Sequence, residues 1–137
     1  MEVSMPKATQ MNLKLENKIG ILATLCRDLA DMGVNLLAIS APQTTAKTGP
    51  IRLLVTNPDL AEHALAKAGY KFIKEEVLYV ELKNRPGALA KAIEKLAKAD
   101  IDVRYAYATA FSKAQKTAAV IAVEENQLDR ADELFFR

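Results

Sequence analysis

The sequence predicts an α+β protein built from two βαββαβ units, the second of which lacks its last strand. Segments with strand-like alternation and segments with helical spacing of apolar residues follow one another in that order, and the order then begins again. The turn at 17–20 returns at 84–87, and one constant offset in residue number relates the two units. The first unit is therefore expected over residues 10–75 and the second over residues 76–137.

The offset between the two turns holds through strand, turn, helix and strand, which makes it stronger evidence than any single match. Identical residues coincide in the two units at this offset: Asn17, Gly20, Leu22, Ala23, Leu29, Ala30 and Ala41 with Asn84, Gly87, Leu89, Ala90, Leu96, Ala97 and Ala108.

The first unit is expected to contain four strands and two helices. In its first strand, Met11, Leu13 and Leu15 alternate with polar residues, which predicts one buried face. Gly33 and Gly69 follow the helical patterns, and glycine most easily adopts the left-handed conformation that ends a helix. The expected elements are, in order, strand 10–16, helix 21–32, strands 34–41 and 51–56, helix 57–68 and strand 70–74.

The second unit repeats this pattern but stops after its second helix. The expected elements are strand 77–83, helix 88–99, strands 101–110 and 117–123, and helix 126–135. In a βαββαβ sheet the last strand lies at an edge, so its loss leaves that edge unpaired. Either the lead-in at residues 1–9 or another subunit could cover it.

The composition is that of a soluble globular protein, with half of the residues apolar and 26% charged. The 19 Lys and Arg and 17 Asp and Glu residues are scattered, so there is no electrostatic argument for a nucleic-acid or membrane partner. Cys26 is the only cysteine, which excludes an intramolecular disulfide, and its helical context predicts a small buried hydrophobe. With neither a signal peptide nor an apolar run of about 20 residues, a cytoplasmic location is expected.

The duplicated turn has the chemistry of an anion site. A helix that begins directly after a strand leaves its first backbone N–H groups unpaired, and these can bind a carboxylate. Gly20 and Gly87 would let a ligand approach the backbone. Asn17 and Asn84 could hydrogen-bond a backbone group or a ligand, and Arg85 could pair with a carboxylate or point into solvent. An Asn before a helix is most often only a cap, but here the pattern occurs twice.

No catalytic set is predicted. His63, the only histidine, is expected to face solvent or to be lightly packed, and not to act as a ligand or base. Glu75 and Glu76 are adjacent between two predicted strands, where neighbouring side chains face opposite ways and make a poor acid/base pair. The sequence contains no Gly-rich phosphate loop, and neither a metal nor a cofactor is expected.

Two βαββαβ units, each with an Asn-x-(Pro)-Gly-x-Leu turn after the first strand, resemble a stand-alone tandem ACT-domain protein over about residues 10–135. The segment 81–89, ELKNRPGAL, carries the more specific match. The resemblance implies ferredoxin-like antiparallel sheets with helices on one face. It also implies side-by-side pairing through second strands, within a chain or in a homodimer, and a small ligand, usually an amino acid, at that junction.

The resemblance implies two ligand sites, each formed by the turn of one unit and the second strand of another. The first would use Asn17, Gly20, Ile21 and Leu22 with Asp102 and Val103. The second would use Asn84, Gly87, Ala88 and Leu89 with Asn35 and Leu36, to which the chemistry of the turn adds Arg85. The second site is favoured, because Asp102 would repel a carboxylate and Ile19 replaces the proline found at Pro86.

Three functions remain in consideration. The leading hypothesis is a non-catalytic regulatory module that senses an amino acid. The alternative is a structural or oligomerisation protein whose ACT-like units bind no ligand. A small enzyme on the same fold is least favoured, because fold alone excludes no activity but no catalytic set is evident. The sequence does not indicate which protein would be regulated.

Overall fold

The computed structural model describes residues 7–135, which form two compact units. The first unit comprises residues 9–75, and the second comprises residues 7–8 together with 76–135. Each unit has its own buried cluster of apolar side chains. The α+β class predicted from the sequence is confirmed, with antiparallel strand pairing in each unit.

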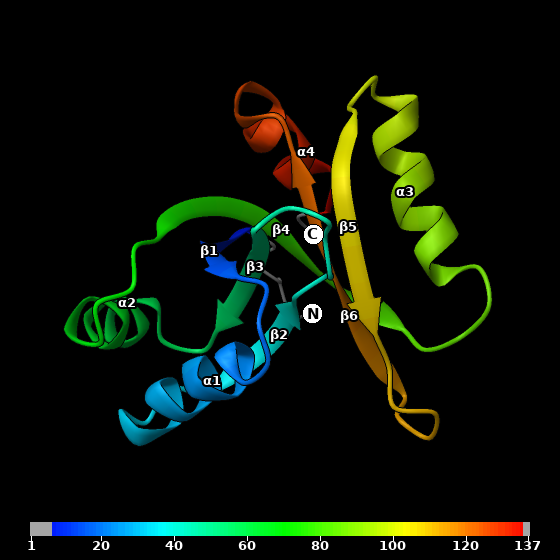
Figure 1. Ribbon diagram of the computed structural model, residues 1–137. Helices are drawn as coiled ribbons and strands as arrows, with labels where there is room; N and C mark the ends of the chain where they lie inside the picture. The colour runs from blue at the N-terminus through cyan, green and yellow to red at the C-terminus, as the bar shows by residue number, and fades with distance from the viewer. Residues whose placement is uncertain (1–6, 136–137) are drawn as a thin grey trace. The chain divides into compact units, whose positions relative to one another are not determined.

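The first unit is an antiparallel sheet in the order β2-β3-β1, to which the start of β4 is added (Figure 1). Leu13 of β1 lies opposite Ile51 of β3, and Leu53 of β3 lies opposite Ile39 of β2. The elements are β1 (Lys7–Glu16), α1 (Ile21–Asp31), β2 (Leu36–Ser40), β3 (Thr48–Val55), α2 (Pro58–Lys67) and the first residues of β4 (Ile73–Lys83).

Both helices of the first unit pack on the same face of its sheet. Leu25 and Leu29 of α1, one helical turn apart, lie on one side of the helix and are fully buried. They share a cluster with alternate strand residues such as Met11 and Leu13, and with Leu65 of α2. This is the layered arrangement that the periods of 3.6 and 2 predict.

The second unit has the sheet order β4-β6-β5, and its own helices pack against one face of these strands (Figure 1). In its core, Leu96 of α3 packs in one buried cluster with Leu78 of β4 and Ile121 of β6. Ala131 of the last helix belongs to the same cluster. The elements are the rest of β4, α3 (Ala88–Lys98), β5 (Val103–Thr109), β6 (Lys116–Val123), a short 3-10 helix η1 (Glu125–Gln127) and α4 (Leu128–Phe135).

The sequence predicted two strands at 70–74 and 77–83, and this was wrong. The structure has one continuous strand, β4, which starts in the first unit and continues in the second. The reason is local: the segment 74–77 contains no Gly, Pro or Asn that would turn the chain. Tyr70 and Phe72 precede this strand and pack against the first core instead.

The start of the described chain belongs to the second unit. Lys7 and Ala8 belong to the second unit, and Lys7 Nζ lies 3.2 Å from Asp129 Oδ1 on α4. The expectation for residues 1–6 falls outside the part of the chain that the structure describes. Within residues 7–135, no strand follows α4, and no helix is long and apolar enough to span a membrane.

Candidate functional site

The two turns have the same backbone conformation. Gly20 immediately precedes α1 with φ 88° and ψ −10°, and Gly87 immediately precedes α3 with φ 88° and ψ −11°. This left-handed conformation is favoured for glycine, because it has no Cβ. Neither residue supplies a side-chain cap, so the amides that follow the first one in each helix are left to solvent or to a ligand.

Hydrogen bonds within the two turns also correspond. The N–H of Ile21 donates to the carbonyl of Lys18 over 3.4 Å, and the N–H of Ala88 donates to the carbonyl of Arg85 over 3.3 Å. These bonds are long, so they constrain the first amide of each helix only weakly. The turns are therefore duplicates in geometry as well as in sequence.

The two turn asparagines hold the neighbouring hairpin loops. Asn17 Nδ2 donates to the carbonyl of Ala46 and to Thr44 Oγ1, 2.5 Å and 3.0 Å away. Asn84 Nδ2 donates to the carbonyl of Phe111, 3.1 Å away, and to that of Ala114, 2.9 Å away. Of the two roles considered from the sequence, the structure shows the bond to nearby backbone. Each asparagine joins its turn to the loop between the second and third strands of its unit.

A cavity lies at each turn. The first turn cavity, of about 400 Å³, and the second turn cavity, of about 250 Å³, are each lined by residues of a single unit. Eight lining positions coincide at the offset that relates the two units: Leu15, Glu16, Asn17, Lys18, Leu22, Ala41, Pro42 and Gln43 with Leu82, Lys83, Asn84, Arg85, Leu89, Ala108, Thr109 and Ala110. The duplication therefore extends to two corresponding concave surfaces.

Partly exposed leucines line both cavities. Leu22 is 37% exposed and Leu89 is 44% exposed, although both lie in the first turn of an amphipathic helix. At the first turn, Ile19 is fully exposed in the position that Pro86 occupies in the second. Apolar side chains in contact with water beside unpaired amides suit a ligand with both a carboxylate and an apolar part.

The predicted second-strand residues lie at the other end of each unit. Asn35 and Leu36 stand at the start of β2, where the carbonyl of Asn35 accepts the N–H of Thr56 over 3.1 Å. The turn at Asn17 lies beside the opposite end of β3, where Glu16 is paired with Thr48. Within the first unit, these two sets of residues are not brought together.

The second unit has the same separation. Asp102 and Val103 stand at the start of β5, and Val103 is opposite Val123 at the end of β6. The turn at Asn84 lies beside the beginning of β6, because Lys83 is paired with Lys116. A site of the predicted kind therefore needs a turn and a second strand that come from different units.

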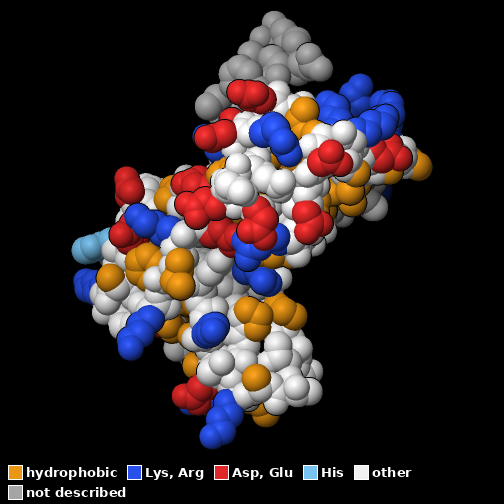
Figure 2. Space-filling model, turned by 90° about the horizontal axis from the view of Figure 1, so that it is seen from above, with side chains coloured by type: hydrophobic (Ala, Val, Ile, Leu, Met, Phe, Trp, Pro, Cys, Tyr) orange, Lys and Arg blue, Asp and Glu red, His pale blue; other side chains and the backbone are white. Residues whose placement is uncertain are grey.

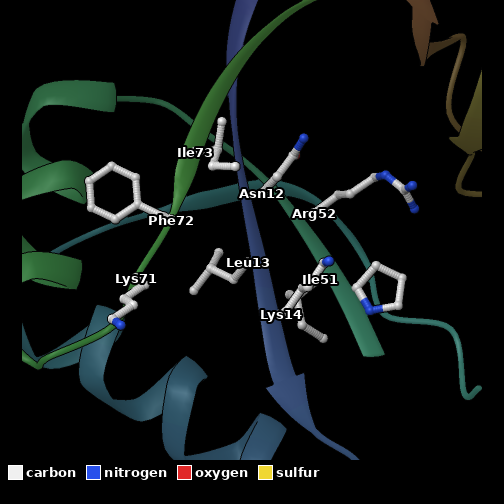
Figure 3. Close-up of a pocket in the computed structure, with 9 residues that line it drawn as sticks. Asn12, Leu13, Lys14, Ile51, Arg52, Lys71, Phe72 and Ile73 are labelled. Carbon is white, nitrogen blue, oxygen red and sulfur yellow. The ribbon is translucent and has the colours of Figure 1, made fainter. Parts of the chain in front are cut away.

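A further cavity, of about 560 Å³, was not predicted from the sequence (Figure 3). It lies in the first unit, between β1 and β3 on one side and the segment leading into β4 on the other. Lys14, Arg52 and Lys71 line it together with apolar residues such as Phe72 and Ile73. In the sequence these three basic residues lie at ordinary polar positions of predicted strands, and no local pattern distinguishes them from other surface residues. Arg52 and Lys71 extend in different directions in Figure 3.

The residues considered for catalysis are exposed or engaged in structural contacts. His63 is exposed, and the pale blue histidine lies at the surface in Figure 2. Glu75 accepts a hydrogen bond of 2.7 Å from Asn12, and Cys26 is half-buried. Within residues 7–135, no group of three or more His, Cys, Asp or Glu residues is placed to hold a metal ion. Acidic and basic side chains are interspersed on the face shown in Figure 2.

The pKa of Tyr70 is raised well above its usual value. Its hydroxyl donates to Asp28 Oδ2 over 2.8 Å, which ties the segment before β4 to α1. Burial, and then this bond to a carboxylate, raise the pKa of Tyr70 to about 12. The contact is within the first unit and away from both turns, so its role is structural.

Comparisons with known proteins agree with this fold. The family model described as "ACT domain pair" matches residues 7–136. The crystal structure of protein BT0572 from Bacteroides thetaiotaomicron is 30% identical with a TM-score of 0.82, and the match covers 93% of this chain and 85% of that one. No curated protein matches the chain.

Two regulatory subunits share the fold at lower identity. The regulatory subunit of aspartate kinase from Thermus thermophilus, in a ligand-free form, is 16% identical with a TM-score of 0.65, and the match covers 98% of this chain and 93% of that one. The corresponding subunit from Thermus flavus is 17% identical with a TM-score of 0.63, and the match covers the same shares.

Proposed function

Because the chain belongs to the ACT domain family, as a pair of such domains, we propose that it is a regulatory module that binds an amino acid and catalyses no reaction. The observation that carries this proposal is the duplicated turn cavity, in which eight lining positions correspond. The structural neighbours named as regulatory subunits of aspartate kinase support the regulatory role. We propose that the protein acts in the cytoplasm.

The ligand's carboxylate would bind the uncapped amides at the start of α1 or α3. These N–H groups carry the positive end of the helix dipole, which favours an anion. Gly20 and Gly87 keep the backbone accessible, since a Cβ added at either would find open space beside it. Leu22 or Leu89 would contact the apolar part of the ligand.

The second strand of a different unit would complete each site, within the chain or across a homodimer. Asn35 and Leu36 would face the turn at Gly87, and Asp102 and Val103 would face the turn at Gly20. Asn35 has a neutral amide that can hydrogen-bond either end of an amino acid, whereas Asp102 attracts only its ammonium group. The turn at Gly87 with Asn35 is therefore the preferred amino-acid site.

The direct test places a negative charge at the entrance to the site. Leu89→Glu should abolish stabilisation of the protein by its amino acid, because the new carboxylate repels that of the ligand. The same change should not lower the thermal midpoint without ligand, because an acidic residue is favourable in the first turn of a helix. Thermal shift with each common amino acid measures both effects.

The control is Leu89→Gln, which has nearly the same size and no charge. It should retain most of the ligand response. If Leu89→Glu responds to the amino acid as the parent does, the proposed position of the carboxylate is wrong.

A second candidate function is assembly without a ligand. The edge strand β2 exposes Leu37 by 42% and Ile39 by 39%, and apolar residues on an open edge favour pairing with another chain. Under this alternative no common amino acid shifts the thermal midpoint, while the protein still forms an oligomer at micromolar concentration.

A further inference from the structure

We propose that the second turn cavity, unlike the first, prefers a small ligand with two carboxylates, such as an acidic amino acid. This inference rests on the function proposed above and specifies the ligand class of one of its two sites. The two cavities lie at turns of the same backbone conformation and are lined by corresponding residues. A difference in charge between the two linings therefore directly affects which ligand each cavity prefers.

The first turn cavity is electrically balanced. Its two charged lining residues are Glu16 and Lys18, and Lys18 Nζ lies 3.7 Å from Glu16 Oε2. A ligand with one carboxylate and one ammonium group, which is itself neutral, meets a pair with no net charge. A second carboxylate on the ligand would gain little there, because Lys18 already has a partner.

The second turn cavity is cationic. Lys83 replaces Glu16, and Arg85 replaces Lys18, so the two charged lining residues have the same sign. Neither forms an ion pair with any residue in the part of the chain that the structure describes. Both side chains are at least partly exposed and can turn toward a ligand in the cavity.

The β4–β6 ladder adds a third cation beside this cavity. Lys83 is directly opposite Lys116, and like charges at opposed positions of a ladder destabilise it. Lys116 Nζ is held 3.3 Å from Glu81 Oε1, which leaves Lys83 without a compensating charge among the described residues. The corresponding pair in the first unit, Glu16 and Thr48, has no such repulsion. A bound carboxylate would relieve the repulsion around Lys83.

The size and wall of the cavity limit the ligand to a short chain. The volume of about 250 Å³ is below the range of about 300 to 1,000 Å³ that accommodates drug-sized ligands. Leu82, Ala88 and Leu89 provide an apolar wall on which a few methylene groups can lie. One carboxylate at the start of α3 and another near Lys83 and Arg85 describe a dicarboxylic acid.

The experiment compares glutarate with butyrate, which have similar chains but two and one carboxylates. Each would be titrated into the full chain and followed through the amide NMR signals of Leu22 and Leu89, which report the two cavities separately. Glutarate should bind about tenfold more tightly than butyrate at Leu89, and without preference at Leu22. Raising the salt to about 0.5 M should reduce the difference, because salt screens exposed charges.

Matched variants locate the effect. Lys83→Gln and Arg85→Gln should each weaken glutarate about threefold to fivefold, in the range of an exposed ion pair. Lys18→Gln, the equivalent change in the first turn, should leave glutarate binding at Leu89 unchanged. Equal affinity for glutarate and butyrate, or an equal loss in Lys18→Gln, would overturn the proposal.

The proposed function and this inference fail in different ways. If neutral amino acids shift Leu89 but glutarate has no advantage over butyrate, the regulatory site stands and the dicarboxylate assignment is wrong. If neither amino acids nor either acid shifts Leu22 or Leu89, both are wrong.

Discussion

At the scale of single residues, Tyr70 makes the stability of the first unit sensitive to pH in the alkaline range. Its folded-state pKa is raised to about 12, above the value of 10 expected in the unfolded chain. The bond from its hydroxyl to Asp28 therefore stabilises the fold fully below pH 10 and is lost as the pH rises toward 12. Tyr70→Phe should lower stability at pH 8 by about 1 kcal/mol and flatten the decline between pH 10 and 12. Urea unfolding across this pH range measures both effects. If the free energy of unfolding of Tyr70→Phe falls between pH 10 and 12 as steeply as that of the parent, the assignment is wrong.

The side chain of Asn17 in the first turn leaves no room for a side chain at Gly49. A Cβ at this position would lie 2.8 Å from Asn17 Oδ1, too close for any real contact. Gly49→Ala should therefore displace the Asn17 side chain and loosen the loop at 44–47, with a loss of about 1 kcal/mol. Hydrogen exchange of the loop amides would show the loosening.

A double-mutant cycle separates this effect from a general effect of alanine. In Asn17→Ala protein the obstructing oxygen is absent, so Gly49→Ala should cost much less there. Additive losses from the two substitutions would show that the steric conflict is not the cause.

At the scale of elements, α1 and α3 are duplicates whose buried residues should have similar energetic weight. Leu29 and Leu96 occupy corresponding positions in the two units and are 1% and 0% exposed. Leu29→Ala and Leu96→Ala should each cost about 2 to 5 kcal/mol, because each leaves a cavity in a separate core. Chemical denaturation measures the losses, with Leu22→Ala as a partly exposed control. A loss below about 1 kcal/mol in either would contradict the assigned core.

The elements show how far the sequence can be read. Periodicity and the constant offset between the units predict the helices, the order of strands and the two turns, because these depend on local patterns. The continuity of β4 across residues 73–83 was missed, since two adjacent strands without a turn residue look the same whether joined or separate. The partners of Asn17 and Asn84 could not be predicted either, because the loop carbonyls that they bind are 27 to 30 residues away in the chain.

The difference in charge between the two cavities could likewise not be interpreted from the sequence alone. The exchange of Glu16 for Lys83 is visible in the sequence, but its meaning depends on knowing that both residues line corresponding cavities. The second-strand residues Asn35 and Asp102 were assigned through the family resemblance, and their place opposite a turn stays a prediction.

At the scale of the whole molecule, the open edge of β2 predicts how copies of the chain associate. Strand β2 ends its sheet, and its residues Leu37 and Ile39 are apolar and exposed. If copies pair through this edge, as proposed, Leu37→Lys with Ile39→Lys should convert the dimer to a monomer, because two lysines on each edge repel those of a second copy. Sedimentation equilibrium over a range of concentrations would follow the change.

The control for this change is Ile73→Lys. Ile73 is 73% exposed, more than either β2 residue, but lies at the start of β4, on the opposite side of the first unit's sheet from β2. It removes an equally apolar surface side chain, so a general loss of hydrophobicity would affect both variants alike. Dissociation in Ile73→Lys but not in the β2 variant would show that association occurs elsewhere. If the β2 variant alone dissociates and also loses its response to ligand, the second strand both joins the copies and completes the site, as expected if Asn35 faces a turn of another unit.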